Sequence, residues 1–220
     1  MINKVQSQAI TEDAIAIDKK KIQLETVAVV ESGQNENIHW TFPSILLRYG
    51  VQSNIELRLT TAMEGGHNVH QQKTNTFENV ELGVKLHLLK NKIANLSVIS
   101  HIIFPTNTEK LLNNEVNAIT SVIASLDMSK KFQLGGAIHY NFEEFAQRSI
   151  DYSILIYYIF SKEWNIHLEN FGALREERNK IVNLGIDWQF KKNLQWQISL
   201  GTKLKQEYNY ISAGMVWQVN

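Results

Sequence analysis

Apolar and polar residues alternate with a period of two along most of this chain, and this alternation limits the possible folds more than any other feature. Leu57 and Leu59 alternate with Glu56, Arg58 and Thr60, and equally regular runs cover 80–88, 132–142, 182–190 and 194–201. Helical spacing is hard to find. Alternation of this kind predicts β-strands that have one apolar and one polar face.

About twelve alternating segments recur along the sequence, and most are about ten residues long. Strands of globular proteins most often have about 5–6 residues. Tilted membrane-spanning strands need about 9–11 residues, which these segments match. The segments lie near 21–31, 38–49, 54–63, 77–89, 94–104, 116–127, 132–142, 150–160, 164–174, 180–190, 194–204 and 210–219.

Short and long connections also take turns along the chain. Gly50–Ser53 and Lys90–Ile93 are short, whereas Glu64–Thr76 and Pro105–Glu115 are long. Outer-membrane barrels have this pattern of tight periplasmic turns and longer external loops. We therefore predict an all-β fold: a closed antiparallel transmembrane (outer-membrane) β-barrel of about 12 strands. Residues 21–220 would form this single domain, and residues 1–20 would be a polar lead-in that stays periplasmic or enters the barrel.

Composition excludes several other classes of protein. The 220 residues include 22 basic and 22 acidic side chains, so the chain lacks the basic surface that nucleic-acid binding needs. It has no cysteine and hence no disulfide or thiolate site. The longest apolar run, Ile154–Phe160, is far shorter than the ~18 residues of a membrane helix. Met1–Gln8 lacks the apolar core of a signal peptide, and with a barrel following it we expect a processed envelope protein.

Aromatic residues near the strand ends suggest which face meets lipid. Two aromatic girdles around an aliphatic band are typical of a membrane barrel, and a twelve-stranded lumen is too wide to fill easily with apolar side chains. The turn-side girdle would comprise Tyr49, Phe132, Phe160, Trp164, Trp188, Phe190, Trp196 and Trp217. The loop-side girdle would comprise Trp40, Phe42, Phe77, Phe104, Tyr140, Phe142, Tyr152, Phe171, Tyr208 and Tyr210. Lipid contacts would come from residues such as Leu57, Leu82, Ile156, Ile186 and Leu200.

Three early segments carry a family resemblance: Lys21–Thr26 (KIQLET), Ser44–Gly50 (SILLRYG) and Asn54–Leu59 (NIELRL). With Glu81–Lys85 (ELGVK), they resemble the outer-membrane barrels grouped as "Putative MetA-pathway of phenol degradation" or transporter proteins. The resemblance covers residues 21–90 well. The lead-in Thr11–Ala16 lacks the Arg-Pro often present in that family, and the chain ends on Asn220 and not on an aromatic residue. The resemblance implies an outer-membrane location and movement of small, often hydrophobic or aromatic, compounds.

Charged residues concentrate on the inward-facing positions of the first four predicted strands. They are Glu25, Arg48, Glu56, Arg58, Glu81 and Lys85, with His87 beside them. A hairpin centred near Gln52 would place Arg48 directly opposite Glu56, where opposite charges attract. Partly desolvated lumen charges should pair. Such a network either fixes the shape of the barrel or constricts the lumen and sets its charge selectivity, and the two roles are compatible.

The sequence gives little sign of catalysis or of a cofactor. The inward-facing His101, His139 and His167 lie on different strands, which makes a converging metal site improbable. The pair His67 and His70 could bind a metal but lies in a polar loop. No serine elbow is present, and Ser100 and His101 point to opposite faces of one strand. We therefore expect no catalytic residues, no metal, no cofactor and no enzymatic activity.

The sequence favours a narrow passive channel or transporter for small solutes in the bacterial outer membrane. Its expected partners are outer-membrane lipid and a small-molecule solute, with other envelope proteins as further candidates. The alternative is a non-conducting barrel that serves as a structural or accessory subunit of an outer-membrane complex, with residues 1–20 as a plug.

Overall fold

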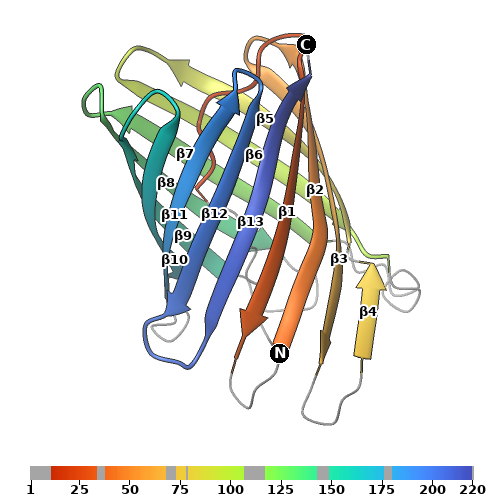
Figure 1. The fold of residues 1–220 in the computed structure, drawn as a ribbon. Helices are drawn as coiled ribbons and strands as arrows, with labels where there is room; N and C mark the ends of the chain where they lie inside the picture. Colours follow the sequence, from red (N-terminus) through yellow and green to blue (C-terminus); the bar gives the residue numbers. More distant parts are fainter. Residues whose placement is uncertain are drawn as a thin grey trace.

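The computed structural model describes residues 11–33, 38–67, 73–77, 79–106, 117–142, 149–175 and 180–219, and the strands among them form one antiparallel sheet (Figure 1). Its strands are β1 (Ile22–Ser32), β2 (Ile38–Gln52), β3 (Ile55–His67), β4 (Lys73–Phe77), β5 (Val80–Lys90), β6 (Ala94–Phe104), β7 (Asn117–Asp127), β8 (Phe132–Phe142), β9 (Ser149–Ile159), β10 (Trp164–Ala173), β11 (Ile181–Lys191), β12 (Leu194–Lys203) and β13 (Asn209–Val219). No helix long and apolar enough to cross a membrane occurs in these ranges.

Twelve of these strands close into a barrel. β1 pairs with β2 along one edge and with β13 along the other, so the first and last strands join. Ile22 lies opposite Val219 in this seam, and every other barrel strand pairs with its neighbours around the ring. The predicted closed barrel of about 12 strands is confirmed.

Short polar side chains shape three of the tight turns. Asn91 Oδ1 accepts hydrogen bonds from the amides of Ile93 and Ala94 at the turn between β5 and β6. Ser129 Oγ and Ser161 Oγ do the same for the amides two and three residues ahead of them. Such side chains fix a turn by satisfying backbone donors locally. The connections at this end of the barrel are short, so we call it the turn end and the opposite end the loop end.

The strand β4 departs from the predicted loop 64–76. β3 continues to His67, and β4 pairs with its loop-end part, with Met63 opposite Phe77. The turn-end part of β3, from Ile55 to Thr60, pairs with β5 instead. Figure 1 shows β4 beside β3 at the loop end, where it extends the wall of the barrel outward. The loop prediction was therefore wrong at both of its ends, and His70 lies outside the described residues.

The outer face of the barrel is apolar. Leu57, Leu82, Ile156, Ile186 and Leu200 all point outward and are 40–58% exposed. Between the two aromatic girdles the outward-facing strand positions that the structure describes carry no Lys, Arg, Asp or Glu. Charged side chains point inward instead, so the barrel is inverted relative to a soluble one and is suited to lipid.

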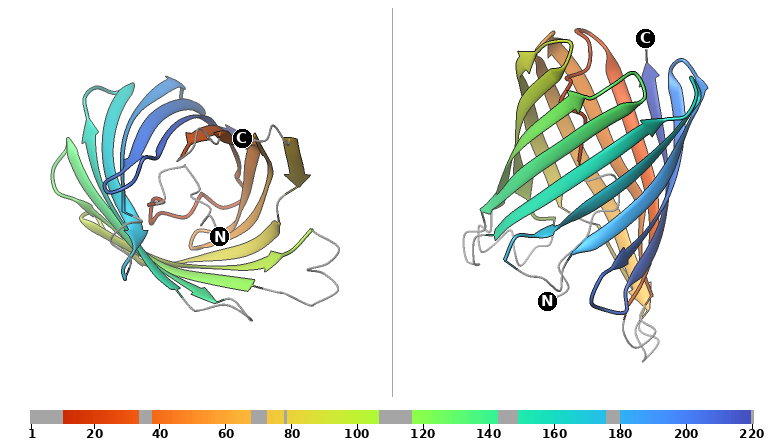
Figure 2. Two further views of the ribbon diagram at one scale, coloured as in Figure 1. Left: turned by 90° about the horizontal axis from the view of Figure 1, so that it is seen from below. Right: turned by 90° about the vertical axis from the view of Figure 1, so that its left-hand side faces the viewer.

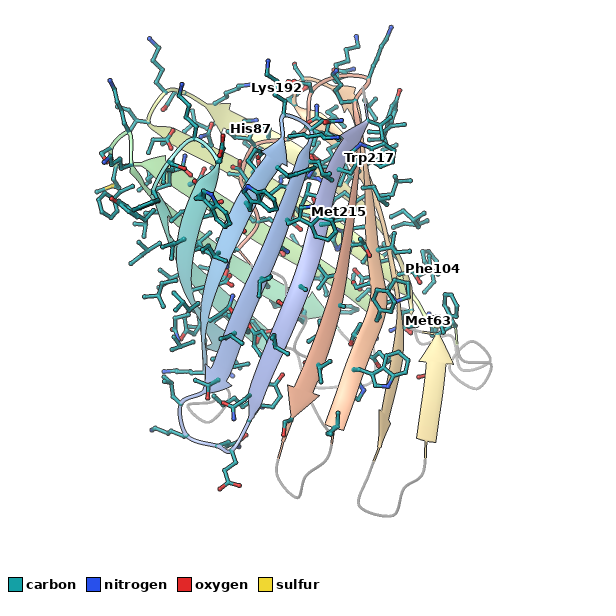
Figure 3. The ribbon with its side chains drawn as sticks, viewed as in Figure 1. Met63, His87, Phe104, Lys192, Met215 and Trp217 are labelled. Carbon is teal, nitrogen blue, oxygen red and sulfur yellow. The ribbon has the colours of Figure 1, made fainter. Side chains whose placement is uncertain are left out.

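The turn-side girdle faces outward, because all eight of its aromatic side chains are exposed. Figure 3 places Trp217 toward the turn end and Phe104 toward the loop end. The prediction for the loop side was partly wrong, since Phe171 and Tyr210 are only 3% exposed and face the lumen, with Tyr208 packed against them. Phe171 follows inward-facing Glu169 by two positions, and the period of two gives both the same face.

The described part of the lead-in, residues 11–20, runs inside the ring of strands (Figure 2). The amide of Lys20 donates to the carbonyl oxygen of Gly50 at the turn end, 2.7 Å away. From there the segment extends into the lumen as far as Thr11, whose amide reaches the Glu169 carboxylate. We call residues 11–18 the plug segment.

Candidate functional site

An ion cluster lies on the inner wall formed by β1, β2 and β3. Arg48 donates to Glu56 through two nitrogens, with Nε at 2.6 Å from Oε1 and a terminal nitrogen at 2.9 Å from Oε2. Its other terminal nitrogen is 3.0 Å from Glu25. Arg58 also donates to Glu56 Oε1, at 2.7 Å. Because Glu56 is fully buried and Arg58 nearly so, these contacts compensate charges that water does not reach.

The strand register of this cluster differs from the predicted one. Arg48 lies opposite Arg58, and Glu56 lies opposite Gly50. The predicted direct opposition of Arg48 and Glu56 was therefore wrong by two residues. The contact between them is diagonal, which long side chains can span across neighbouring strands.

The plug segment completes the ion cluster. Glu12 forms an ion pair with Arg58, and its second oxygen is 3.6 Å from Lys85 Nζ. Lys85 is fully buried and donates to the backbone carbonyl oxygen of Asp13 at 2.6 Å. Three of the predicted lumen residues therefore contact the plug segment. Arg58 and Lys85 contact the side chain of Glu12, Lys85 also contacts the backbone of Asp13, and Glu56 contacts the backbone of Ile17.

Two wall carboxylates hold the backbone of the plug segment. Glu56 Oε2 accepts the amide of Ile17 at 3.0 Å, and Glu169 Oε1 accepts the amide of Thr11 at 2.7 Å. At the turn end the fit is tight, because a Cβ atom at Gly50 would lie 2.1 Å from the carbonyl oxygen of Asp18. The segment is thus fixed at both ends and in its middle.

An apolar seat on the opposite wall receives the other side of the plug segment. Ala14 is fully buried against Ile99, Ile123 and Ala137 of β6, β7 and β8. Ser97 donates through Oγ to the carbonyl oxygen of Ala14. The plug segment therefore lies between a charged wall and an apolar wall, and small residues at 14 and 16 allow both walls to approach it.

Two of the predicted residues lie apart from the ion cluster. Glu81 is 3.3 Å from His101 Nδ1 on the neighbouring strand β6. His87 is buried and faces the lumen, and its Nε2 has no hydrogen-bond partner among the described residues (Figure 3).

The loop-side half of the lumen carries an apolar patch that sequence reasoning missed. Five lumen-facing side chains are at most 4% exposed and pack together with Tyr208: Val27, Val29, Phe171, Ile181 and Tyr210. The stretch Val27–Val30 is apolar on both faces, which breaks the alternation and could have signalled the patch. The width of a twelve-stranded barrel predicts a polar lumen. The lumen wall is polar only in part, because it includes this apolar patch.

The lumen histidines His139 and His167 each lie beside a different neighbour and do not converge. His167 Nδ1 is 3.2 Å from Asp187, and the same Asp187 oxygen accepts from Tyr157 at 2.6 Å. Ser121 Oγ and His139 Nδ1 are 2.7 Å apart. Asp151 lies directly opposite His139 on the neighbouring strand β9, and it accepts a hydrogen bond from Asn141. Among the described residues, no group of three or more histidine or carboxylate side chains is arranged to hold a metal ion.

Solved structures with the same fold include outer-membrane porins and channels. An outer-membrane channel from Pseudomonas putida F1 matches with a TM-score of 0.68 and 13% identity, covering 94% of this chain and 98% of that one. The KdgM porin matches with a TM-score of 0.66 and 10% identity, covering 90% and 99%. At these identities the likeness establishes the fold.

No curated protein sequence matches the chain. A family model, in contrast, matches residues 8–218, which include the plug segment and all barrel strands except for Val219, the last residue of β13. The chain therefore belongs to the family described as "Putative MetA-pathway of phenol degradation".

Proposed function

We propose that this protein is a passive channel of the bacterial outer membrane for small solutes of apolar character. The observation that carries this proposal is the division of the lumen into two halves. The turn-side half holds the plug segment between the ion cluster and the apolar seat. The loop-side half has the apolar patch around Phe171 and Tyr210 on its wall.

The apolar patch favours apolar solutes over ions or sugars. The side chains of the patch are at most 4% exposed, so in this proposal a solute contacts them only after neighbouring side chains move apart. An apolar solute that then packs against them removes apolar surface from water, worth about 25 cal/mol per Å², and a hydrophilic solute gains nothing there. Two solved structures of similar fold support this direction by their names. They are a toluene transporter, TodX from Pseudomonas putida, and CymD, a monoaromatic hydrocarbon channel, each with a TM-score of 0.50 and 8% identity.

In this proposal the predicted lumen charges act on the plug segment. Arg58 and Lys85 hold Glu12 and the carbonyl oxygen of Asp13, and Glu56 holds the amide of Ile17. A solute that enters from the loop end reaches the patch first and passes the turn-side half only when the plug segment shifts. The proposed channel is passive, so net flow follows the solute gradient.

A reversible lock on the plug segment tests the proposal. The chain has no cysteine, and Ser97 contacts the backbone of Ala14, so the double variant Ala14→Cys/Ser97→Cys would carry the only two thiols. The protein is reconstituted in liposomes that contain lipopolysaccharide, and uptake of naphthalene is measured before and after reduction. We expect oxidised protein to match protein-free liposomes and reduced protein to accelerate uptake. Equal uptake in the two states, at the level of protein-free liposomes, would reject the channel.

The alternative function is a non-conducting accessory barrel, and the observation that favours it is the set of contacts that hold the plug segment in the lumen. In that case wild-type, oxidised and reduced proteins all leave uptake unchanged. Affinity purification of the wild-type protein from envelopes would then recover a stoichiometric envelope partner, which a channel acting alone does not need.

A further inference from the structure

An open apolar groove lies on the outer face of the barrel, at the turn end of β10 and β11. Phe160, Trp164, Ile166 and Ile186 line it, and its volume is about 310 Å³. These four side chains are 38–66% exposed, so the groove is accessible from outside the barrel. An apolar cavity of about 150 Å³ already admits benzene, so this space can hold a stretch of an acyl chain.

The tight turn between β9 and β10 shapes one side of the groove. The amides of Phe160 and Ser161 both donate to the carbonyl oxygen of Trp164, at 3.0 Å each. Ser161 Oγ accepts the amides of Glu163 and Trp164 in return. These bonds keep Phe160 and Trp164 next to each other, and they place Lys162 in the turn that joins the two rings of the groove.

A row of aromatic rings leads from the groove to a second lysine. The Trp164 and Trp188 rings are stacked with centroids 5.5 Å apart, and the Phe190 ring lies edge-on to Trp188 at 5.0 Å. Lys191 Nζ is 5.5 Å from the centroid of the Phe190 ring. Because Phe190 is 48% exposed on the outer face, this ammonium group lies on the lipid side of the wall.

The strand register orders these residues by depth. Ile166 lies opposite Ile186, and Trp164 lies opposite Trp188 two residues nearer the turn end. Lys191 lies nearer the turn end still, beyond Trp188 on β11. Aliphatic side chains, then aromatic rings, then ammonium groups follow the acyl chains, the interface and the headgroups of a phospholipid layer.

The turn end is basic, although the chain as a whole has no net charge. Its residues 18–20, 90–93, 127–131, 160–163 and 191–193 include nine exposed lysines and three carboxylates. Figure 3 shows Lys192 at this end. The lysines are Lys19, Lys20, Lys90, Lys92, Lys130, Lys131, Lys162, Lys191 and Lys192, and the carboxylates are Asp18, Asp127 and Glu163.

Charge and depth together favour one kind of occupant. The turns of outer-membrane barrels face the periplasm, so the leaflet beside the groove is the one that consists of phospholipids. Lysines at a lipid surface attract anionic headgroups, whereas a zwitterionic headgroup has no net charge to be attracted. A periplasmic protein could contact the turns, but it could not reach Ile166 and Ile186 below the aromatic rings.

We propose that this groove is a binding site for an anionic phospholipid of the inner leaflet. One acyl chain lies against Phe160, Trp164, Ile166 and Ile186, and Lys162 and Lys191 attract the headgroup. The site depends on how the barrel lies in the membrane and is independent of whether the lumen conducts a solute.

Native mass spectrometry of the purified full chain in a non-ionic detergent tests the headgroup part of the site. Phosphatidylglycerol and phosphatidylcholine with identical acyl chains are added in equal amounts, and the ratio of their one-lipid complexes is measured. We expect wild-type protein to favour phosphatidylglycerol. Lys162→Gln/Lys191→Gln should lower the ratio about five-fold, roughly the effect of one lysine at a charged lipid surface. Lys90→Gln/Lys92→Gln removes two charges from another turn of the same end and should leave the ratio unchanged.

A second pair of variants tests the groove. Ile166→Phe fills it with a larger apolar side chain and should reduce the complexes of both lipids. Ile154→Phe makes the same change at a 50% exposed position that does not line the groove, and it should bind both lipids as wild-type protein does.

Three results would each overturn the proposal. A wild-type ratio of one would exclude selection of the anionic headgroup, and this measurement needs no variant to fold. An equal fall in the ratio for the two lysine pairs would show a general attraction to the basic turn end without a site. Equal lipid binding by the two isoleucine variants would exclude the groove. None of these measurements involves transport, so their failure leaves the channel proposal standing, and failure of the channel leaves the lipid site standing.

Discussion

Arg48 and Arg58 face each other across β2 and β3, and both donate to the same carboxylate oxygen, Glu56 Oε1. The two distances are 2.6 and 2.7 Å. Glu56 also accepts the amide of Ile17 from the plug segment through Oε2. One fully buried carboxylate thus keeps two like charges together and holds the segment that lies in the turn-side lumen.

Glu56→Gln should destabilise the barrel strongly. The variant keeps the shape of the side chain and removes the negative charge between two guanidinium groups, and breaking a buried ion pair typically costs about 3–5 kcal/mol. Urea unfolding of protein in lipid, followed by tryptophan fluorescence, measures the change. Glu163→Gln in an exposed turn is the control and should change stability by less than about 0.5 kcal/mol. Equal stability of the two variants would show that the cluster carries no net stabilisation.

Gly50→Ala should displace the base of the plug segment. The added methyl group would lie 2.1 Å from the Asp18 carbonyl oxygen, and backbone cannot move aside as a flexible side chain can. Overpacking of this kind costs about 1–3 kcal/mol, which would raise the displaced population about tenfold. Limited trypsin digestion at Lys19 and Lys20 measures the effect as faster cleavage. Gly33→Ala, where a Cβ atom has nothing within 4 Å, should be cleaved at the wild-type rate. If Gly50→Ala is cleaved at the wild-type rate, the segment is not held at this glycine.

Leu184→Arg should weaken the barrel in the membrane. Leu184 is 54% exposed on the outer face, and its cross-strand neighbours Leu168 and Leu200 are also exposed leucines. Arginine near the bilayer midplane of such a barrel costs about 2–4 kcal/mol. Folding yield into liposomes at increasing urea measures this. The same change at Met128, which is 67% exposed at a turn, should cost no more than about 1 kcal/mol near the interface. Equal cost at the two positions would contradict a lipid-facing Leu184.

Quenching of tryptophan fluorescence by brominated lipids should show the depth of the aromatic girdles in the bilayer. The five tryptophans are Trp40 on the loop side and Trp164, Trp188, Trp196 and Trp217 on the turn side. Bromine near the headgroup end of the acyl chain should quench their fluorescence more than bromine at the chain terminus, because tryptophan in girdles lies at the interface. Stronger quenching from the chain terminus would place these side chains at the bilayer centre and reject the girdles.

Much of the fold could be predicted because alternation is a local signal. The predicted segments 132–142 and 194–204 agree with β8 and β12 to within one residue. Register is less local. The hairpin between β2 and β3 turns at Ser53 and Asn54, and β2 has an irregularity between Gly50 and Gln52 that the alternation of side chains does not reveal. A hairpin centred one residue later than predicted shifts the cross-strand partner of Arg48 by two residues, from Glu56 to Arg58.

The candidate site was less predictable because its contacts join distant parts of the chain. The residue types of the ion cluster are apparent in 48–58, yet the plug segment that completes it contacts Lys85 and Glu169, far along the sequence. Phe171 and Tyr210 were assigned to the lipid side because girdles are recognised by position along a strand. Their actual face follows from Glu169 and Ser212, the inward-facing residues two positions away.

The junction of β1 with β13 has a consequence for the order of assembly. The plug segment is continuous with β1, and β1 completes the ring only after β13, the last strand of the chain, is available to pair. Contacts between segments that are distant in sequence form slowly, because the chain loses conformational entropy before the stabilising contacts are made. The walls that hold the plug segment, from β1 to β10, are complete only when this seam has closed, so the contacts of the plug segment form late as well. A lead-in that is still outside when the ring closes would have to enter through the turn end, beside Gly50.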